Sequence, residues 1–412
     1  MGCSSTKVGT GYRLNDPPGE EPAARPRGPP GKSGRPGRGR SNSHELAWLA
    51  RRGSGDEVKR TATSATFEFG QVLGVGQTGR VRVARHKTSS KWYAIKCISN
   101  ADIVRKKLGS QIKCEVTLLQ RLDSPFIIGY FGAFQSQRSG GSCYVALEYA
   151  PGGELYHRLT TVNRLPLEEA KFYTVEIALA LDYLHMQDLV YRDLKPDNLL
   201  IDEHGHIKLV DFGLTRSLAP DGTCNSGPAG TAQYLAPEIV ATMQGRDASG
   251  KPMNTSSRKL MASGGGGRRA THGVGVDWWA LGCILYEMLE GKPPFGDSAK
   301  LPKYEIFTRI ASGKFAFSKT SSKGGPASAR HLISRLLQLN PRERLVFKGV
   351  ESHPCFEGLD WARARRGEAP PPHVPALTRP GDTTAFPSFD KWEQGDGEEV
   401  DRSFKPVEFM VV

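Results

Sequence analysis

The stretch Tyr191-Arg-Asp-Leu-Lys-Pro-Asp-Asn198, followed by Asp211-Phe-Gly, decides the fold of this chain. Asp193 is suited to accept the proton of an attacking hydroxyl, and Lys195 to neutralise a transferring phosphoryl group. Asn198 and Asp211 offer the oxygen ligands that Mg²⁺ prefers, with Mn²⁺ as an alternative ion. Polar groups of these four types, on loops between short apolar runs, rarely arise for packing reasons. The two motifs therefore predict a site for phosphoryl transfer.

A glycine-rich stretch lies upstream. Leu73-Gly-Val-Gly-Gln-Thr-Gly-Arg-Val81 has the G-x-G-x-x-G-x-V spacing of a phosphate-binding loop between two segments of alternating polarity. Because glycine has no Cβ, Gly74, Gly76 and Gly79 let backbone N–H groups approach phosphates closely. The glycine pattern alone is weak evidence in a chain with 47 glycines. Its position ahead of the next motif makes it specific.

That next motif is Tyr93-Ala-Ile-Lys96. Lys96 stands in a predicted strand among apolar neighbours, where an unpaired cation would be costly. The phosphates of ATP and a carboxylate from the following helix would satisfy it. Glu115 is the best candidate for this carboxylate, because Leu118 and Leu119 follow it at i+3 and i+4. The alternative is that Glu115 is an ordinary solvated carboxylate on a helix surface.

Together these motifs resemble those of eukaryotic protein kinases, and most closely the cyclic-nucleotide-dependent kinases of the AGC group. Three features indicate that group: Tyr191 in place of the commoner histidine, the run Glu148-Tyr-Ala-Pro-Gly-Gly-Glu154, and the tail segments Pro371–Pro375 and Gly381–Phe386. The resemblance implies an α+β, bilobal protein-kinase fold. Its small lobe would be mainly β-sheet with one key helix, its larger lobe mainly helical, and an AGC-type tail would follow.

The resemblance also divides the chain into parts. The two lobes together would form a kinase domain over residues 67–356. An insert within the large lobe, at about residues 242–271, is rich in Gly, Ser and Arg, and we expect it to be a disordered loop. The parts are a basic N-terminal segment (1–60), the small lobe (67–147), the large lobe (148–356), an insert in the large lobe (about 242–271) and the C-terminal tail (357–412).

ATP would bind in the cleft between the lobes, since ligands favour domain junctions. The resemblance implies that the hinge backbone at Glu148 and Ala150 makes hydrogen bonds to adenine, and that Phe386 in the tail completes the pocket. Apolar side chains would hold the adenine ring from both sides, namely Leu73, Val81, Ala94 and Leu200.

Four further residues take roles by the same resemblance. Thr231 matches a catalytic-site threonine that bridges the predicted base and the lysine two residues after it. Glu238 matches a glutamate that forms a buried ion pair, here with Arg344. Asp277 matches an aspartate that braces the backbone of the catalytic loop. We expect the last three residues to be structural and not catalytic.

Three acidic residues fall where the resembled kinases bind arginines of the substrate: Glu154, Asp197 and Glu287. A guanidinium paired with a desolvated carboxylate gives a strong and directional contact. Asp197 is one methylene shorter than the family glutamate, so its contact should be weaker. The prediction is a Ser/Thr kinase that transfers the γ-phosphoryl group of ATP to protein substrates with Arg before the acceptor.

The alternative function is a kinase-like membrane scaffold with weak or no catalysis that binds partners or nucleotide. Degenerate kinases usually lose the equivalents of Lys96, Asp193 or Asp211. All three residues are present in this chain, so the sequence favours catalysis.

The activation segment departs from its family. The position of the usual activating threonine is Gly227, with Ser226 and Thr223 nearby as alternative phosphosites. Arg192 and Arg216 remain as phosphate receivers. Order in this segment must therefore come from another phosphate or from none. Ser226 also replaces the tryptophan that is usual in cyclic-AMP-dependent kinases, which argues against a cyclic-nucleotide-binding regulatory subunit as a partner.

Composition points to a cytoplasmic protein. The seven cysteines include no C-x-x-C pair, which indicates reduced thiols. No apolar run approaches the length of a membrane span. Much of the formal charge of +13 lies in residues 22–40, which are rich in Pro, Gly and basic residues. Because no aromatic residues are interleaved there, we expect no nucleic-acid partner.

The first residues predict a lipid anchor. Met1-Gly-Cys-Ser-Ser-Thr6 matches the N-myristoylation pattern at Gly2, and Cys3 is available for palmitoylation. One acyl chain binds membranes only marginally, so a second lipid or a basic stretch is needed. This chain has both, which predicts a membrane-associated protein. The alternative is a chance match on a disordered tail.

Overall fold

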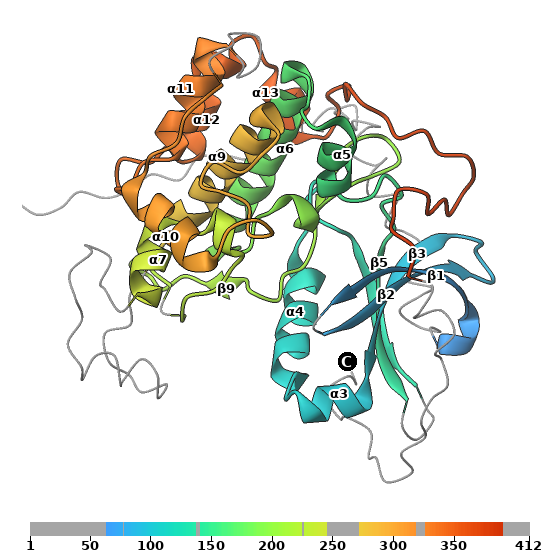
Figure 1. The fold of residues 1–412 in the computed structure, drawn as a ribbon. Helices are drawn as coiled ribbons and strands as arrows, with labels where there is room; N and C mark the ends of the chain where they lie inside the picture. The colour runs from blue at the N-terminus through green and yellow to red at the C-terminus, as the bar shows by residue number, and fades with distance from the viewer. Residues whose placement is uncertain are drawn as a thin grey trace, which may run out of the picture. The chain divides into compact units, whose positions relative to one another are not determined.

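A computed structural model describes residues 63–389 of the 412, except 77, 137–140, 225, 245–271 and 319–325. In these ranges the chain forms a small lobe built on a β-sheet and a large lobe built mainly of helices (Figure 1). This arrangement confirms the predicted bilobal α+β fold. The predicted N-terminal segment, with Gly2 and Cys3, lies outside the described residues.

The small lobe is an antiparallel sheet of five strands in the order β1-β2-β3-β5-β4. Two helices connect its third and fourth strands, and a 3-10 turn precedes the first. The elements are η1 (Ser64–Thr66), β1 (Phe67–Gly76), β2 (Gly79–His86), β3 (Trp92–Ser99), α3 (Asn100–Arg105), α4 (Gly109–Arg121), β4 (Tyr130–Gln135) and β5 (Ser142–Glu148).

Strand β3 shows how this sheet separates its two faces. Successive side chains of a strand point to opposite faces. Tyr93 and Ile95 join an aromatic cluster in which the rings of Phe67 and Phe134 stack with centroids 5.6 Å apart. Ala94 instead joins an apolar cluster with Leu73 on the other face. Lys96 follows Ala94 by two residues, so its side chain lies on the same face of the sheet as Ala94 and Leu73.

The large lobe is organised around helix α9, in which every residue from Val276 to Glu290 is buried. The helix ends where Gly291 adopts a left-handed φ of 74°, a C-terminal conformation that glycine favours. Short strands pair as β6 with β9 and β7 with β8. The elements are α5 (Leu155–Val162), α6 (Leu167–His185), β6 (Leu189–Val190), η2 (Pro196–Asn198), β7 (Leu199–Ile201), β8 (Ile207–Leu209), β9 (Arg216–Ser217), η3 (Ala232–Tyr234), α7 (Pro237–Met243), α9 (Gly275–Glu290), α10 (Lys303–Ser312), α11 (Ala327–Leu336), α12 (Phe347–Glu351), η4 (Pro354–Phe356) and α13 (Trp361–Arg365).

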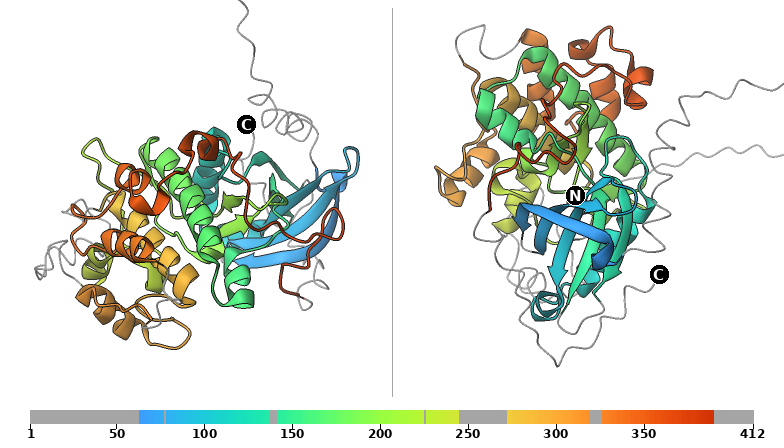
Figure 2. Two further views of the ribbon diagram at one scale, coloured as in Figure 1. Left: turned by 90° about the horizontal axis from the view of Figure 1, so that it is seen from above. Right: turned by 90° about the vertical axis from the view of Figure 1, so that its right-hand side faces the viewer.

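The tail after α13 returns to the small lobe, along its sheet (Figure 2). Thr383 donates a hydrogen bond to Gln71 of β1 at 2.6 Å. Gly381 packs so closely on the ring of Trp92 that a Cβ at this glycine would lie 2.5 Å from it. The tail therefore contacts the two strands that border the predicted nucleotide pocket.

Helix α7 continues through Thr242 to Met243, so it reaches the start of the predicted insert, at about residue 242. The helix extends this far because Ile239 and Val240 are buried and Thr242 donates a hydrogen bond to the carbonyl of Glu238 at 2.9 Å. Residues 245–271 lie outside the described part of the chain. No helix within the described ranges has the length and apolar character needed to cross a membrane.

Candidate active site

The loop that contains Asp193 is fixed by its backbone. Asp277, at the start of α9, accepts hydrogen bonds from the backbone N–H groups of Tyr191 and Arg192 at 2.9 and 2.8 Å. His185 lies 2.8 Å from the same carboxylate. Asp277 is almost completely buried, at 1% exposure. The structure therefore confirms that Asp277 braces this loop, and it adds His185 to the brace.

The Asp193 carboxylate is held from three sides. Thr231 donates a hydrogen bond to Oδ1 at 3.0 Å, and Asn198 donates one to Oδ2 at 3.2 Å. Asn198 also donates to the Asp193 carbonyl at 2.8 Å. The Lys195 Nζ lies 3.5 Å from Oδ2. Thr231 thus contacts Asp193, one of the two residues that it is predicted to bridge, and Lys195 lies beside the same carboxylate.

The two predicted metal ligands are brought together by the pairing of β7 with β8. The backbone N–H of Val210 donates to the carbonyl of Asn198 at 3.0 Å, which places Asp211 next to this asparagine. Asp211 has a left-handed φ of 57°, a strained conformation that concentrates at functional sites. Within the described ranges, no cluster of three or more His, Cys, Asp or Glu side chains is arranged to hold a metal. A Mg²⁺ ion here would need phosphate and water oxygens to complete its coordination.

Lys96 and Glu115 form a close ion pair. The Lys96 Nζ lies 2.7 and 3.0 Å from the two carboxylate oxygens of Glu115. Their side chains are only 13% and 9% exposed. The pair confirms that Glu115 is the partner of Lys96 and excludes the alternative of a solvated carboxylate. It also joins α4 to the sheet.

The three glycines of the glycine-rich motif, at the end of β1 and the start of β2, differ in the space around them. A Cβ at Gly74 would meet no atom within 4 Å, and one at Gly76 would meet only the Gly79 carbonyl, at 3.8 Å. The space beside these two glycines is open to a ligand. A Cβ at Gly79 would instead lie 2.3 Å from the carbonyl oxygen of Cys97. Packing on β3 therefore requires the third glycine, a reason that the sequence motif did not reveal.

An apolar cluster lies beside this loop, where the sequence predicts the adenine site. Leu73, Val81 and Ala94 pack together there, as predicted, and Phe386 from the tail joins them. Tyr149 also belongs to this cluster, with its ring stacked on Phe386 at a centroid distance of 6.1 Å. The tyrosine hydroxyl donates to the tail carbonyl of Asp382. Leu200 lies in β7 and forms an isolated bridge with Glu154.

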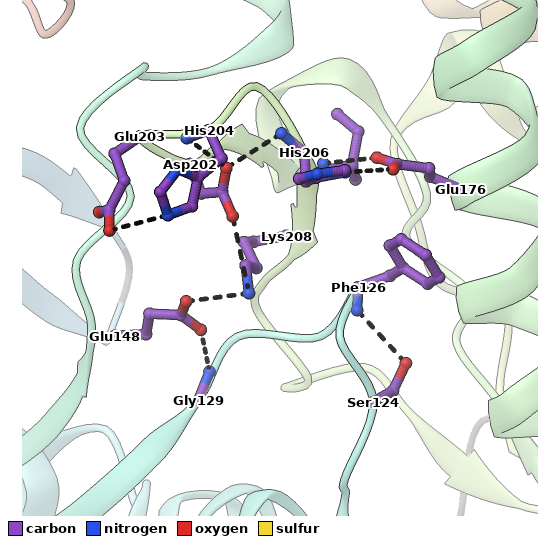
Figure 3. Close-up of polar contacts among 11 residues, drawn as sticks. Ser124, Phe126, Gly129, Glu148, Glu176, Asp202, Glu203, His204, His206 and Lys208 are labelled. Atoms are coloured by element: carbon purple, nitrogen blue, oxygen red, sulfur yellow. Dashed lines mark hydrogen bonds and ion pairs between the residues drawn. The ribbon is translucent and has the colours of Figure 1, made fainter. Parts of the chain in front are cut away.

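The side chain of the hinge residue Glu148 is held by contacts within the protein (Figure 3). The Glu148 carboxylate lies 2.9 Å from the Lys208 ammonium of β8 and accepts a hydrogen bond from the Gly129 backbone at 2.9 Å. Lys208 also lies 3.9 Å from Asp202. The side chain of Glu148 is therefore occupied within the protein. The contact of the Glu148 backbone with a nucleotide stays a prediction.

Two of the three acidic residues predicted to bind substrate, Glu154 and Glu287, have raised pKa values, with burial as the main cause. Burial, and then the charge of Asp197, raises the pKa of Glu154 to about 7. Burial likewise raises the pKa of Glu287 to about 7, helped by Asp197 and Asp297 and opposed by a hydrogen bond from Tyr234. That hydrogen bond is 2.7 Å long. Asp297 was missed in the sequence because it lies in a loop after α9 and matches no motif.

The sequence was compared with those of known proteins. It matches the protein kinase domain family over residues 67–356. It is 33% identical over 328 residues to the human cAMP-dependent protein kinase catalytic subunit PRKX, a match covering 78% of this chain and 80% of the relative. It is 34% identical over 332 residues to the cAMP-dependent protein kinase catalytic subunit of Dictyostelium discoideum, covering 79% and 45%. For the serine/threonine-protein kinase Sgk1 of Danio rerio the identity is 34% over 342 residues, covering 81% and 70%.

The fold, the site and these matches show that the chain belongs to the protein kinase family. Its relatives place it in the AGC group of that family. Some relatives are much longer than the region they share with this chain. The chain spans 32% of Protein kinase 3 of Dictyostelium discoideum, 45% of the cAMP-dependent catalytic subunit of the same organism and 58% of that of Arthrobotrys oligospora.

Proposed function

We propose that this protein is an active serine/threonine kinase that transfers the γ-phosphoryl group of ATP to protein substrates with Arg before the acceptor. One observation carries the proposal: the Lys96–Glu115 pair is closed in the same structure in which Thr231 and Asn198 orient the Asp193 carboxylate. A kinase needs both arrangements at once, because its catalysis is mostly positioning and electrostatic stabilisation.

Each residue has a distinct task in this proposal. Asp193 accepts the proton of the substrate hydroxyl, and Lys195 offsets negative charge on the group in transfer. Lys96, fixed by Glu115, binds the phosphates nearer the nucleoside. Asn198 and Asp211 are the residues that would hold Mg²⁺, which supplies positive charge to the phosphates when bound.

Phosphate transfer from ATP to a peptide library tests the activity directly. We expect incorporation into Ser and Thr peptides with Arg at the second and third positions before the acceptor. A library profile that favours acidic or proline-directed sites would contradict the substrate assignment. No transfer to any peptide or protein by the full chain would contradict the kinase assignment itself.

The raised pKa values of Glu154 and Glu287 predict that binding of Arg-containing peptides depends on pH. A pKa of about 7 means that Glu154 and Glu287 are each partly protonated in the free kinase. A guanidinium favours the ionised carboxylate, so peptide binding must expel those protons at low pH. The peptide Kd should therefore fall as pH rises from 6 to 8, by up to about tenfold for each carboxyl that titrates near 7.

Fluorescence anisotropy with a labelled peptide measures this Kd without involving the catalytic step. The matched control replaces the peptide arginines with citrulline, which has the same shape without the charge, and its Kd should stay constant. The Glu154→Gln variant should weaken binding of the Arg peptide and flatten its pH dependence. A Kd for the Arg peptide that is the same at pH 6 and pH 8 would show that these carboxylates do not bind the guanidinium.

We also propose that the protein is anchored to a cytoplasmic membrane surface through acylation of Gly2, assisted by Cys3 or the basic run. Only the sequence pattern supports this, because these residues lie outside the described part of the chain. The Gly2→Ala variant should move from the membrane fraction to the soluble fraction, and Cys3→Ser should show a smaller shift. Wild-type protein that is already soluble in cells with active N-myristoyltransferase would contradict the anchor.

A further inference from the structure

A series of three hydrogen bonds runs from the loop after α9 to Glu287, one of the acidic residues predicted to bind arginine. The backbone N–H of Ser298 donates to Oε1 of Gln233 at 2.9 Å. The Nε2 group of Gln233 donates to the hydroxyl of Tyr234 at 3.1 Å, and this hydroxyl donates to Oε2 of Glu287 at 2.7 Å. Gln233 and Tyr234 belong to η3, which precedes α7. The series therefore connects η3 with α9 and with the loop that follows α9.

The direction of each bond in this series follows from its first donor. A backbone N–H can only donate, so the Gln233 atom that faces Ser298 must be the amide oxygen. The amide nitrogen then faces Tyr234, and it can only donate. Because the hydroxyl oxygen receives that bond, its own proton is directed to Glu287. Burial raises the pKa of Tyr234 well above its ordinary value, so the phenol keeps this single proton.

The series lies in the interior of the large lobe. Gln233, Tyr234 and Glu287 are only 9%, 5% and 7% exposed. In such surroundings, linked hydrogen bonds polarise one another, and a polar group left without its partner is costly. The bond that Gln233 donates therefore strengthens the bond that Tyr234 donates to Glu287.

The bond from Tyr234 favours the ionised form of Glu287. Burial raises the pKa of this glutamate to about 7, helped by the charges of Asp197 and Asp297, and the Tyr234 bond acts against this rise. An ionised carboxylate forms the strong, charge-assisted pair with a guanidinium. Among the described residues, Oε1 of Glu287 has no hydrogen-bond partner. This oxygen can therefore accept from an arginine while Tyr234 holds the other one.

The arrangement requires an amide at position 233. Its side chain must accept a bond from Ser298 and donate one to Tyr234 at the same time. An ionised carboxylate has acceptors only, so a glutamate here would take the hydroxyl proton of Tyr234 and leave Glu287 without its donor. An apolar side chain would make neither bond. Glutamine is thus matched to both of its neighbours.

We propose that Gln233 is a positioning residue for arginine recognition, which directs the hydroxyl proton of Tyr234 to Glu287 and so keeps this carboxylate ionised and oriented toward a substrate arginine. This inference rests on the proposed Arg-directed kinase activity. Gln233 does not touch the substrate in this scheme. It acts through Tyr234 and then Glu287, and it affects the selectivity for arginine over an uncharged side chain.

Binding of the Arg peptide and of its citrulline analogue to the full-length protein tests this role. Gln233→Met removes both hydrogen bonds at similar volume, and we expect it to raise the Kd of the Arg peptide about fivefold at pH 7. The Kd of the citrulline peptide should not change. The matched control is Gln338→Met, at a glutamine after α11 that donates to the Ser334 carbonyl at 2.8 Å, and it should change neither Kd.

Two results of this comparison would count against different proposals. Wild-type protein that binds the Arg and citrulline peptides equally would contradict the substrate assignment, and this inference with it. Wild-type protein that prefers the Arg peptide, with the same preference in Gln233→Met, would overturn this inference alone.

A cycle of variants shows whether Gln233 acts through its two neighbours. Adding Gln233→Met to Tyr234→Phe, or to Glu287→Gln, should raise the Kd of the Arg peptide by less than about twofold, because the series is already broken there. A full fivefold rise in either background would mean that Gln233 acts by another route, and the proposal would fail.

A second substitution keeps the test decisive if Gln233→Met does not fold. Gln233→Glu retains an acceptor for Ser298 but competes for the Tyr234 proton. Its added charge attracts arginine equally whether or not Tyr234 is present. The factor by which Gln233→Glu changes the Kd should therefore be less favourable by at least about threefold in the wild type than in Tyr234→Phe. Equal factors in the two backgrounds would overturn the proposal.

The pH dependence separates this role from a packing defect. Glu154 and the titratable groups around Glu287 are common to the wild type and Gln233→Met, so the ratio of the two Kd values for the Arg peptide isolates the change at Glu287. Those groups are Asp197, Asp297, Tyr156, Tyr234 and Cys283. With a weaker bond from Tyr234, Glu287 holds its proton more tightly. The ratio of variant to wild-type Kd should fall as pH rises from about 6 to about 9, where the carboxylate is ionised in both proteins. A ratio above one that does not depend on pH would overturn the proposal.

Discussion

Replacing Asp193 with asparagine should lower phosphate transfer at least about 100-fold while leaving the protein folded. The amide is nearly the same size as the carboxylate and keeps an oxygen that can accept the Thr231 hydrogen bond, now 3.0 Å long. The 2.8 Å bond from Asn198 to the backbone carbonyl also survives. What is lost is the basic group that takes the proton of the substrate hydroxyl. Steady-state transfer to an Arg-containing peptide measures the effect, and thermal unfolding checks the fold.

Two further substitutions should each lower phosphate transfer by a similar factor, for different reasons. Lys96→Met removes the cation that Glu115 positions, and Asp211→Ala removes a predicted metal ligand. The matched control is Asp188→Asn, the same chemical change at an exposed residue whose φ of 54° asparagine tolerates. Its activity should equal that of the wild type. A near-normal rate for Asp193→Asn would mean that another group is the base.

Motif spacing was enough to predict the centre of this site. Lys96, Asp193 and Asp211 each belong to a short run, and these runs follow one another in the order of the protein-kinase signature motifs. Glu115 could also be predicted, because a buried lysine requires a partner and the next helix offers a carboxylate on a suitable face. The structure confirms this pair at 2.7 Å. Local sequence carries such information since each motif is continuous.

Other parts of the site depend on contacts between distant segments, which no local pattern records. Cys224 and His272 form an isolated bridge from opposite sides of the insert, and neither belongs to a motif. Asp297 acts on Glu287 from a loop after α9, where its charge helps to raise the pKa of that glutamate. Tyr149 of the apolar cluster contacts the tail at Asp382 and Phe386. These contacts are consequences of packing, so they became visible only when the lobes and the tail were in place.

The buried ion pair between Glu238 and Arg344 should have the largest effect on stability. Its two N···O distances are 2.8 and 3.0 Å, and the two side chains are 5% and 0% exposed. Arg344 also donates to the carbonyl of Gly275 at 2.7 Å and lies over the ring of Trp279, with 5.1 Å to its centroid. The pair therefore joins α7 to the start of α9 and to the chain that follows α11.

Glu238→Ala should lower the free energy of unfolding by about 3–5 kcal/mol, because it leaves the Arg344 guanidinium buried without a countercharge. The matched control is Glu305→Ala, which breaks an i,i+4 pair with Arg309 whose side chains are 38% and 47% exposed. Its cost should stay below about 1 kcal/mol, since solvent screens exposed pairs. Urea unfolding of the wild type and the two variants measures the loss of unfolding free energy in each variant. Equal stability losses in the two variants would show that solvent or another carboxylate reaches Arg344 when Glu238 is removed, and that burial does not make this pair essential.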